Sequence, residues 1–207
     1  MMNVRVEGKQ KRAHATRAHI LDCFEVLMQS QSFDEISIAQ IAASAEVGKG
    51  TVLAHFSEKL ALAATLFAQE LEKCQQQIEA SAQISSAAKL RSIFTPFFNL
   101  IMRDDVYVRL IVGEGQNLCR QMIEPAEARL FDSLARRLDV GRPAQELDVI
   151  AVRGFLVHAA VMYRACDAGE AVIEEFESLL AHYLFQNLAS SLQCDWPVTH
   201  DWRNKMP

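Results

Sequence analysis

Residues 37–56 read SIAQIAASAEVGKGTVLAHF, and this stretch decides the fold of the N-terminal part of the chain. Ser37 and Gln40 form a capping-box pattern, in which the serine oxygen accepts a backbone amide and the glutamine reaches back to the serine amide. The pattern predicts a short helix over 38–45. The free amides at its N-terminus carry a partial positive charge, which suits a phosphate group.

A tight turn and a second short helix follow the first. Glu46-Val47-Gly48 predicts the turn, and residues 49–55 predict the helix. Two short helices joined by a three-residue turn are what a DNA-reading helix-turn-helix requires. The residues that we expect on the outer surface of the second helix are Lys49, Gly50, Thr51 and Leu53.

The rest of the chain shows helical periodicity. Eight glycines and five prolines in 207 residues are few for a turn-rich β-protein, so the sequence predicts an all-α fold. Pro96 predicts a kink or an early turn within one helix, and Ser57 predicts the N-cap of another. The expected helical segments outside 37–56 are 13–30, 57–82, 89–102, an interrupted segment over 104–118, 126–138, 145–167 and 171–192.

Charge is distributed unevenly along the chain, whose formal net charge is −5. Residues 1–20 contain five basic residues against Glu7 alone. Acids and bases balance over 1–60, so the whole deficit falls on 61–207. A basic arm on an acidic body is typical of a protein that touches phosphates at one end only, although a solvated tail has the same composition.

The cysteines give no sign of a metal site, because they form no C-x-x-C pair and have no histidine at ligand spacing. They are Cys23, Cys74, Cys119, Cys166 and Cys194. We interpret them as reduced thiols, of which one is a candidate redox sensor, and we expect no metal or cofactor. The sequence contains no signal-peptide pattern and no apolar run long enough for a membrane span. We therefore expect a cytoplasmic protein that does not contact a membrane.

The N-terminal part of the chain resembles the TetR family of one-component regulators. That family carries the pattern IA..AGVSKGTLYHHF.SKE.L. This chain supplies Ile41-Ala42, then AEVGKGTVLAHF over 45–56 and SEKLAL over 57–62. The stretch TRAHIL at 16–21 is similar to the opening helix of the family. The remaining two-thirds of the chain matches only in the number and length of its helices.

The resemblance implies two domains and a set of DNA contacts. Residues 1–60 would form a three-helix helix-turn-helix domain for DNA, joined to a larger helical domain for ligand binding and dimerisation at 61–207. Phosphate contacts are implied for Lys49, Thr51, His55 and Lys59, while Gly50 lets the backbone approach the DNA. The full set of expected DNA-binding residues is Ser37, Lys49, Gly50, Thr51, Leu53, His55, Lys59 and Arg17. The structural alternative is solvated surface for the lysines and a packing role for the histidine.

Three residues depart from the family pattern. Glu46 replaces the usual glycine of the turn, and Gly48 replaces the usual serine cap, so the glycine has moved by two positions. Leu53 replaces a tyrosine that reaches a backbone phosphate, and a leucine instead suits a thymine methyl group. These departures affect operator sequence and affinity rather than the mode of binding.

The body is expected, by resemblance, to hold an effector pocket among the helices from residue 60 to 167. Adaptable apolar side chains with a few polar ones suit a small, largely apolar molecule. The candidate pocket residues are Phe94, Phe98, Met102, Glu114, Asn117, Met122, Phe155, His158 and Met162. Arg109 is a further candidate for orienting a ligand. Aromatic and methionine residues at helical spacing are, however, more often simply part of the core.

The last two predicted helices indicate a homodimer. The helix at 145–167 is apolar almost all round, and 171–192 carries an apolar stripe, so one subunit is too small to cover both. Pairing them with their symmetry mates makes a four-helix interface. We expect this dimer to be a repressor that binds a palindromic operator on double-stranded DNA and leaves it when an unidentified small-molecule effector binds the body.

Two other classes of function stay open at this point. One is a small helical enzyme, but its candidate groups are scattered without a motif, so we expect none. Those groups are Glu114, His158, Cys119 and Cys166. The other is a helical adaptor that binds only protein and uses the helix-turn-helix structurally. Hydrolase or transferase activity would favour the enzyme, and failure to retain DNA from its own promoter region would favour the adaptor.

Overall fold

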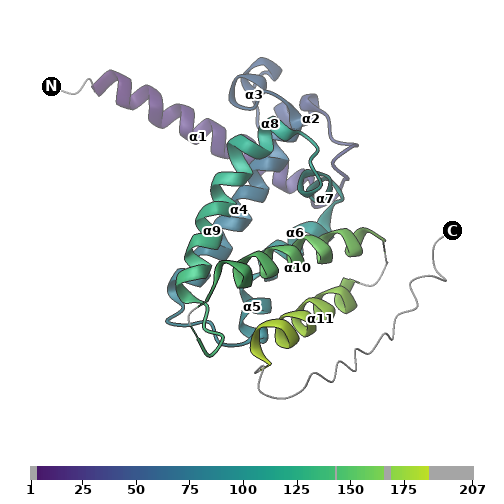
Figure 1. Cartoon of the computed structure of the whole chain (residues 1–207). Helices are drawn as coiled ribbons and strands as arrows, with labels where there is room; N and C mark the ends of the chain where they lie inside the picture. Colours follow the sequence, from purple (N-terminus) through teal and green to yellow (C-terminus); the bar gives the residue numbers. More distant parts are fainter. Residues whose placement is uncertain (1–3, 143, 166–168, 187–207) are drawn as a thin grey trace.

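The structure is an assembly of helices, described over residues 4–142, 144–165 and 169–186 of a computed structural model (Figure 1). The predicted all-α fold is confirmed, because these residues form helices and one isolated β-bridge but no strand. In chain order the elements are α1 (Val4–Leu27), α2 (Ile38–Ser44), α3 (Lys49–His55), α4 (Lys59–Ala80), α5 (Ala87–Ile93), α6 (Thr95–Arg103), α7 (Val106–Ile111), α8 (Gln116–Leu118), the π-helical turn η1 (Cys119–Ile123), α9 (Glu124–Arg137), α10 (Glu146–Ala165), α11 (Gly169–Leu180) and the π-helical turn η2 (Ala181–Phe185).

The first helix is longer than its sequence pattern predicts. α1 begins at Val4 rather than near residue 13, and its N-terminal half projects away from the other helices (Figure 1). Residues 10–15 are exposed, whereas Ile20 and Phe24 are fully buried. The basic arm is therefore a helical extension of the packed part of α1.

The middle of the chain also departs from the predicted boundaries. The expected helix 89–102 is two helices, because α5 ends at Ile93 and Pro96 lies in the first turn of α6, where its missing N–H costs nothing. The prediction that Ser57 caps α4 is wrong. Glu58 occupies the N-cap position, and its side chain makes no cap hydrogen bond.

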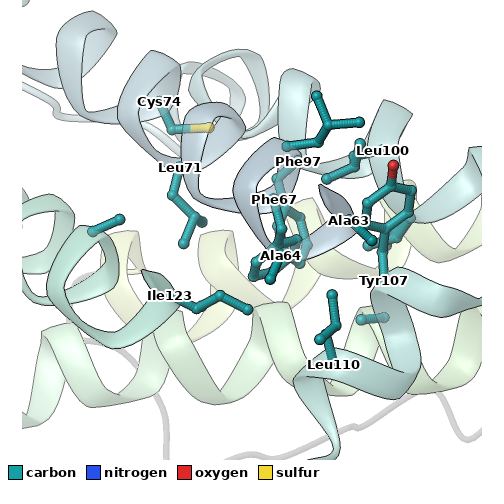
Figure 2. Packing of buried hydrophobic residues seen from close by; sticks show 14 of the residues in the cluster. Ala63, Ala64, Phe67, Leu71, Cys74, Phe97, Leu100, Tyr107, Leu110 and Ile123 are labelled. Atoms are coloured by element: carbon teal, nitrogen blue, oxygen red, sulfur yellow. The ribbon is translucent and has the colours of Figure 1, made fainter. Parts of the chain in front are cut away.

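α4 is the central helix of the body. It lies beside α9 and also packs against α6, α7 and η1 (Figure 1). Figure 2 shows the buried side of α4, where Phe67 meets Phe97 of α6 with ring centroids 6.1 Å apart. Tyr107 and Leu110 of α7 lie in the same cluster. Because α4 has no internal glycine or proline, it connects the N-terminal helices to this core without a hinge.

The connection between α4 and α5 is anchored. The sequence favours a surface joint at 81–86, but Ile84 in that segment is fully buried. Its backbone amide donates to the carbonyl oxygen of Arg137, and its carbonyl oxygen accepts from the amide of Asp139, both at 2.8 Å. These bonds tie the end of α4 to the end of α9.

The helices α10 and α11 pack against each other and cover one side of the body (Figure 1). α10 buries one face, which includes Val152 and Ala160. The part of the predicted helix 171–192 that extends beyond 186 lies outside the described residues. Within the described chain, no helix is both long enough and apolar enough to cross a membrane.

Candidate nucleic-acid interface

The first helix of the predicted motif begins at the predicted cap. The Ser37 hydroxyl accepts from the Gln40 amide at 3.2 Å, and the Gln40 side-chain oxygen accepts from the Ser37 amide at 2.8 Å. This is the capping box expected from the sequence, and it fixes where α2 starts. Ile41 and Ala42 point into the core, so α2 braces the helix that follows it.

The turn between α2 and α3 is a helix C-terminal motif with an unusual occupant. The amide of Glu46 donates to the carbonyl oxygen of Ala43, and that of Val47 donates to Ala42, which is the Schellman pattern. That pattern needs a left-handed residue, usually glycine, yet Glu46 occupies it with a φ of 53°. Gly48 has an ordinary extended φ of −73°. The chain therefore keeps the turn geometry although its glycine has moved.

α3 exposes the face that a DNA-reading helix needs. Lys49, Gly50 and Leu53 are exposed, Thr51 is half-buried, and Val52 on the opposite side is fully buried. A Cβ atom built on Gly50 would meet no atom within 4 Å. The folded chain itself therefore does not require glycine at this position.

Arg17 faces inward against the end of α3. Its guanidinium donates to the backbone carbonyl oxygen of His55, lies 4.0 Å from the ring centroid of Phe56 and reaches the Thr65 hydroxyl at 3.5 Å. Burial lowers the pKa of Arg17 from its ordinary value. The guanidinium of Arg17, for which the sequence predicts a DNA contact, caps the carbonyl end of α3 in this structure.

Lys59 is also occupied within the protein. Its ammonium donates to the carbonyl oxygens of Phe33 at 2.6 Å and Ile36 at 2.8 Å, and it lies 4.2 Å from the Phe33 ring centroid. Burial lowers its pKa. The ammonium of Lys59, for which the sequence predicts a phosphate contact, holds the loop that precedes α2 in this structure.

Residues 20–66 match the family model described as bacterial regulatory proteins, tetR family. The chain carries a TetR-family DNA-binding domain. Its helix-turn-helix is the predicted stretch 37–56, and the match extends into α4. The predicted family is thereby confirmed for the DNA-binding domain.

Solved structures share the fold of most of this chain. A tetR-family transcriptional regulator from Streptomyces coelicolor is 16% identical, with a TM-score of 0.56, over 82% of this chain and 83% of that chain. The transcriptional regulator FadR from Bacillus subtilis, in complex with stearoyl-CoA, is 20% identical, with a TM-score of 0.55, over 81% and 97%. RolR in complex with resorcinol is 18% identical, with a TM-score of 0.58, over 86% and 91%. No curated protein matches the sequence.

The residues predicted for an effector pocket do not gather around one cavity. Phe94 and Phe98 are buried, and their ring centroids lie 6.2 Å and 5.1 Å from that of Phe176. Met102, Glu114 and Asn117 are exposed, whereas Met122 and Met162 are partly buried against the core.

Two of the predicted pocket residues lie together on an exposed groove. Phe155 and His158, both on α10, line a hollow of about 640 Å³ between α10 and α11. Phe155 packs against Tyr183 with ring centroids 5.9 Å apart, and His158 lies 3.9 Å from Glu175. This groove is open to solvent and lies on the apolar face of α10.

Sequence reasoning missed a contact between the DNA-binding domain and the body. Asp104, between α6 and α7, accepts a hydrogen bond from the backbone amide of Phe33 at 2.7 Å. Arg109, which the sequence suggests as a ligand-orienting residue, instead pairs with Asp34 at 3.2 Å. These partners are far apart in the chain, and no short-range pattern could have indicated them.

Proposed function

We propose that this TetR-family regulator is a dimeric repressor, in which residues 1–60 read a palindromic operator and residues 61–207 dimerise and bind an effector. The exposed face of α3 is the observation that supports the DNA-reading role most directly. Lys49 donates to a phosphate, Gly50 allows close approach, and Leu53, which is 47% exposed, meets an apolar base edge. Ser37, Thr51 and His55 complete the contact surface.

An uncovered apolar stripe on α10 supports the dimer. Leu147, Ile150, Val157 and Val161 are between 40% and 63% exposed and recur at helical spacing. Gly154 lies among them, and a Cβ atom built on it would meet nothing within 4 Å. A second copy of α10 can approach closely at this glycine, so the stripe suits helix packing between two subunits.

The dimer is tested by variants of the stripe. Ile150→Glu places a charge in the proposed interface and is expected to give a monomer in sedimentation at micromolar concentration. Gly154→Leu improves helix propensity by about 1 kcal/mol and yet blocks close approach, so it should weaken association without loss of helix content. Arg129→Ala, on α9, is the matched surface control. A folded dimer for both interface variants would contradict the proposal.

We propose that the effector is a small, largely apolar molecule, because the interior of the body is rich in aromatic side chains. Two solved structures that share the fold are ligand complexes: FadR holds stearoyl-CoA, which joins an apolar acyl chain to a charged coenzyme, and RolR holds resorcinol, a small aromatic diol. Stearoyl-CoA and resorcinol are therefore the first probes for thermal stabilisation of this chain. A probe that binds should also release the protein from a duplex selected from a random pool by the wild-type protein.

Release would be transmitted by α4. This helix of 22 residues spans about 33 Å and runs from the DNA-binding domain to the core. A tenfold loss of DNA affinity needs about 1.4 kcal/mol of preference of the effector for the splayed form. Glycine at the exposed positions Gln69 and Gln76 would soften the helix without disturbing its buried face. Release that is unchanged in this double variant would contradict transmission through a stiff α4.

A further inference from the structure

The corner between α6 and α7 holds the loop that leads into the helix-turn-helix. Asp104 uses both carboxylate oxygens there: Oδ1 accepts from the Val106 amide at 2.9 Å, and Oδ2 accepts from the Phe33 amide at 2.7 Å. The bond with Val106 lies at the start of α7, and the bond with Phe33 joins the body to the DNA-binding domain. One carboxylate thus ties a core helix to the loop between α1 and α2.

Arg109 adds a second tie from the same helix. Its two terminal nitrogens lie 3.2 Å and 3.4 Å from the two carboxylate oxygens of Asp34, a bidentate pairing that fixes direction as well as distance. Its guanidinium carbon lies 5.6 Å from the Phe33 ring centroid. Asp34 is 69% exposed, so the pair contributes little to stability, and its effect is on position.

The loop that receives these ties is also braced by Lys59. The Lys59 ammonium bonds to the carbonyl oxygens of Phe33 and Ile36, so it links both ends of the segment that leads to the cap at Ser37. A displacement of α7 is therefore passed to the start of α2. Without the Lys59 bonds, the loop between α1 and α2 would deform, and the displacement of α7 would not reach α2.

α7 is seated on the helix that carries the proposed subunit interface. It packs against α10 and α4, with Val106 and Leu110 buried. After α7 the chain turns at Gly113 and Gly115, both at positive φ, and Gly115 lies against Leu60 in the first turn of α4. The segment from α7 to this turn therefore touches α10, the start of α4 and the loop before α2.

We propose that Asp104 and Arg109 are positioning residues for the helix-turn-helix, through which α7 sets the orientation of α2 and α3 relative to the body and its α10 interface. This inference rests on the proposed function, because orientation matters only when two reading helices must fit one operator. It adds a second connection beside α4.

The inference is tested by measuring DNA affinity as a function of the spacing between half-sites. A variant that is only destabilised has fewer folded molecules, but those molecules keep the wild-type preference for spacing. The probe is the duplex selected by the wild-type protein, together with versions in which one, two or three base pairs are inserted between the half-sites. The variants are Asp34→Ala, Arg109→Ala and the double alanine variant. Arg129→Ala, which breaks the 2.8 Å pair with Glu72 on the body, is the matched control.

The wild type and the control should lose affinity steeply with each insertion. Each single variant should bind the selected duplex about fivefold more weakly and accept the insertions with a smaller further loss. The double variant should be no weaker than either single variant, because both changes remove the same pair. Single variants with the wild-type spacing profile would overturn the inference and leave the dimer intact. A wild type without any spacing preference would overturn the proposed dimeric reading and the inference with it.

Discussion

The guanidinium of Arg17, in the middle of α1, donates a hydrogen bond to the backbone carbonyl oxygen of His55, the last residue of α3. The last carbonyls of a helix have no partner within the helix and carry its partial negative charge. An always-charged side chain that also stacks on Phe56 is well suited to hold this end of α3. Arg17 of α1 therefore holds the C-terminal end of α3 in place.

Replacing Arg17 tests this support. Arg17→Ala removes a charged hydrogen bond and is expected to lower the free energy of unfolding by about 1.5–3 kcal/mol. Arg17→Lys keeps the charge but loses the planar stacking, so it should fall between the wild type and Ala. Thermal unfolding gives the stabilities. The salt dependence of DNA binding should be unchanged in both variants, and a reduced slope would return Arg17 to the set of phosphate contacts.

Lys49 and Lys59 should behave differently although both are lysines near the DNA surface. Lys49 is exposed, so Lys49→Ala should weaken binding to all sequences and reduce the salt slope by about one. Lys59→Met should leave the slope unchanged and lower the melting temperature, because two buried carbonyl oxygens lose their donor. Equal slopes for Lys49→Ala and the wild type would remove Lys49 from the proposed interface.

Gly50 should show opposite effects on folding and on DNA binding. Because space is open around its Cα, Gly50→Ala is expected to stabilise the free protein by about 0.5–1 kcal/mol through helix propensity. The added methyl group lies on the face proposed to meet DNA, so affinity for the selected duplex should fall. Calorimetry and fluorescence anisotropy on the same preparation measure both effects. Unchanged affinity would place the backbone of α3 farther from DNA than we propose.

Glu46 should be replaceable with a gain in stability. Its left-handed backbone costs about 1 kcal/mol in a residue with a Cβ atom, so Glu46→Gly is expected to raise the free energy of unfolding by a similar amount. Glu46→Ala is the control, because it removes the carboxylate and keeps the Cβ atom. An equal gain in both variants would assign the effect to charge rather than to backbone strain.

Asp148, near the start of α10, should make stability depend on acid pH. Two hydrogen bonds from Arg142, at 2.7 Å and 3.0 Å, and one from the Gln145 amide hold the pKa of this carboxyl below its ordinary value, against the opposing effect of burial. At a pH near 4, about the ordinary pKa of an aspartate, Asp148 therefore binds more protons in the unfolded chain than in the folded chain. The contribution of Asp148 to stability is complete above that pH and is lost as the pH falls through the lower folded pKa.

The measurement compares melting temperatures of the wild type and Asp148→Asn across this range. Asp148→Asn should melt lower at neutral pH, by about 2–4 °C for each kcal/mol lost. The difference should shrink as the pH falls below 4. Parallel curves at all pH values would show that the carboxylate charge makes no contribution.

Local sequence patterns predicted the helix-turn-helix well, because its defining contacts join residues that are close together in the sequence. The Ser37–Gln40 cap, the turn and the exposed face of α3 all arise within one stretch of chain. Residue roles that depend on distant partners were not predictable in this way. Lys59 and Arg17 look like surface cations in sequence, yet Lys59 bonds to the loop between α1 and α2, and Arg17 bonds to the end of α3.

The body shows the same limit for the pocket residues. Apolar periodicity locates α10 and α11, but it does not distinguish a residue that lines a cavity from one that fills the core. Phe94 and Phe98 have the spacing of a pocket wall and pack against Phe176, which is far along the chain. Periodicity indicates which face of a helix is apolar. Tertiary packing decides whether that face lines a cavity or packs against side chains from other helices.

In the proposed dimeric repressor, the open stripe on α10 would make regulation depend on the abundance of the chain. In the proposed dimer, folding, assembly and operator occupancy are linked by mass action, so each depends on how many copies a cell contains. At low copy number the stripe from Leu147 to Val161 stays uncovered, and the subunit is a better target for chaperones and proteases than its paired form. A gene that it represses would therefore respond to the rate of synthesis of the regulator more steeply than a single binding site would allow.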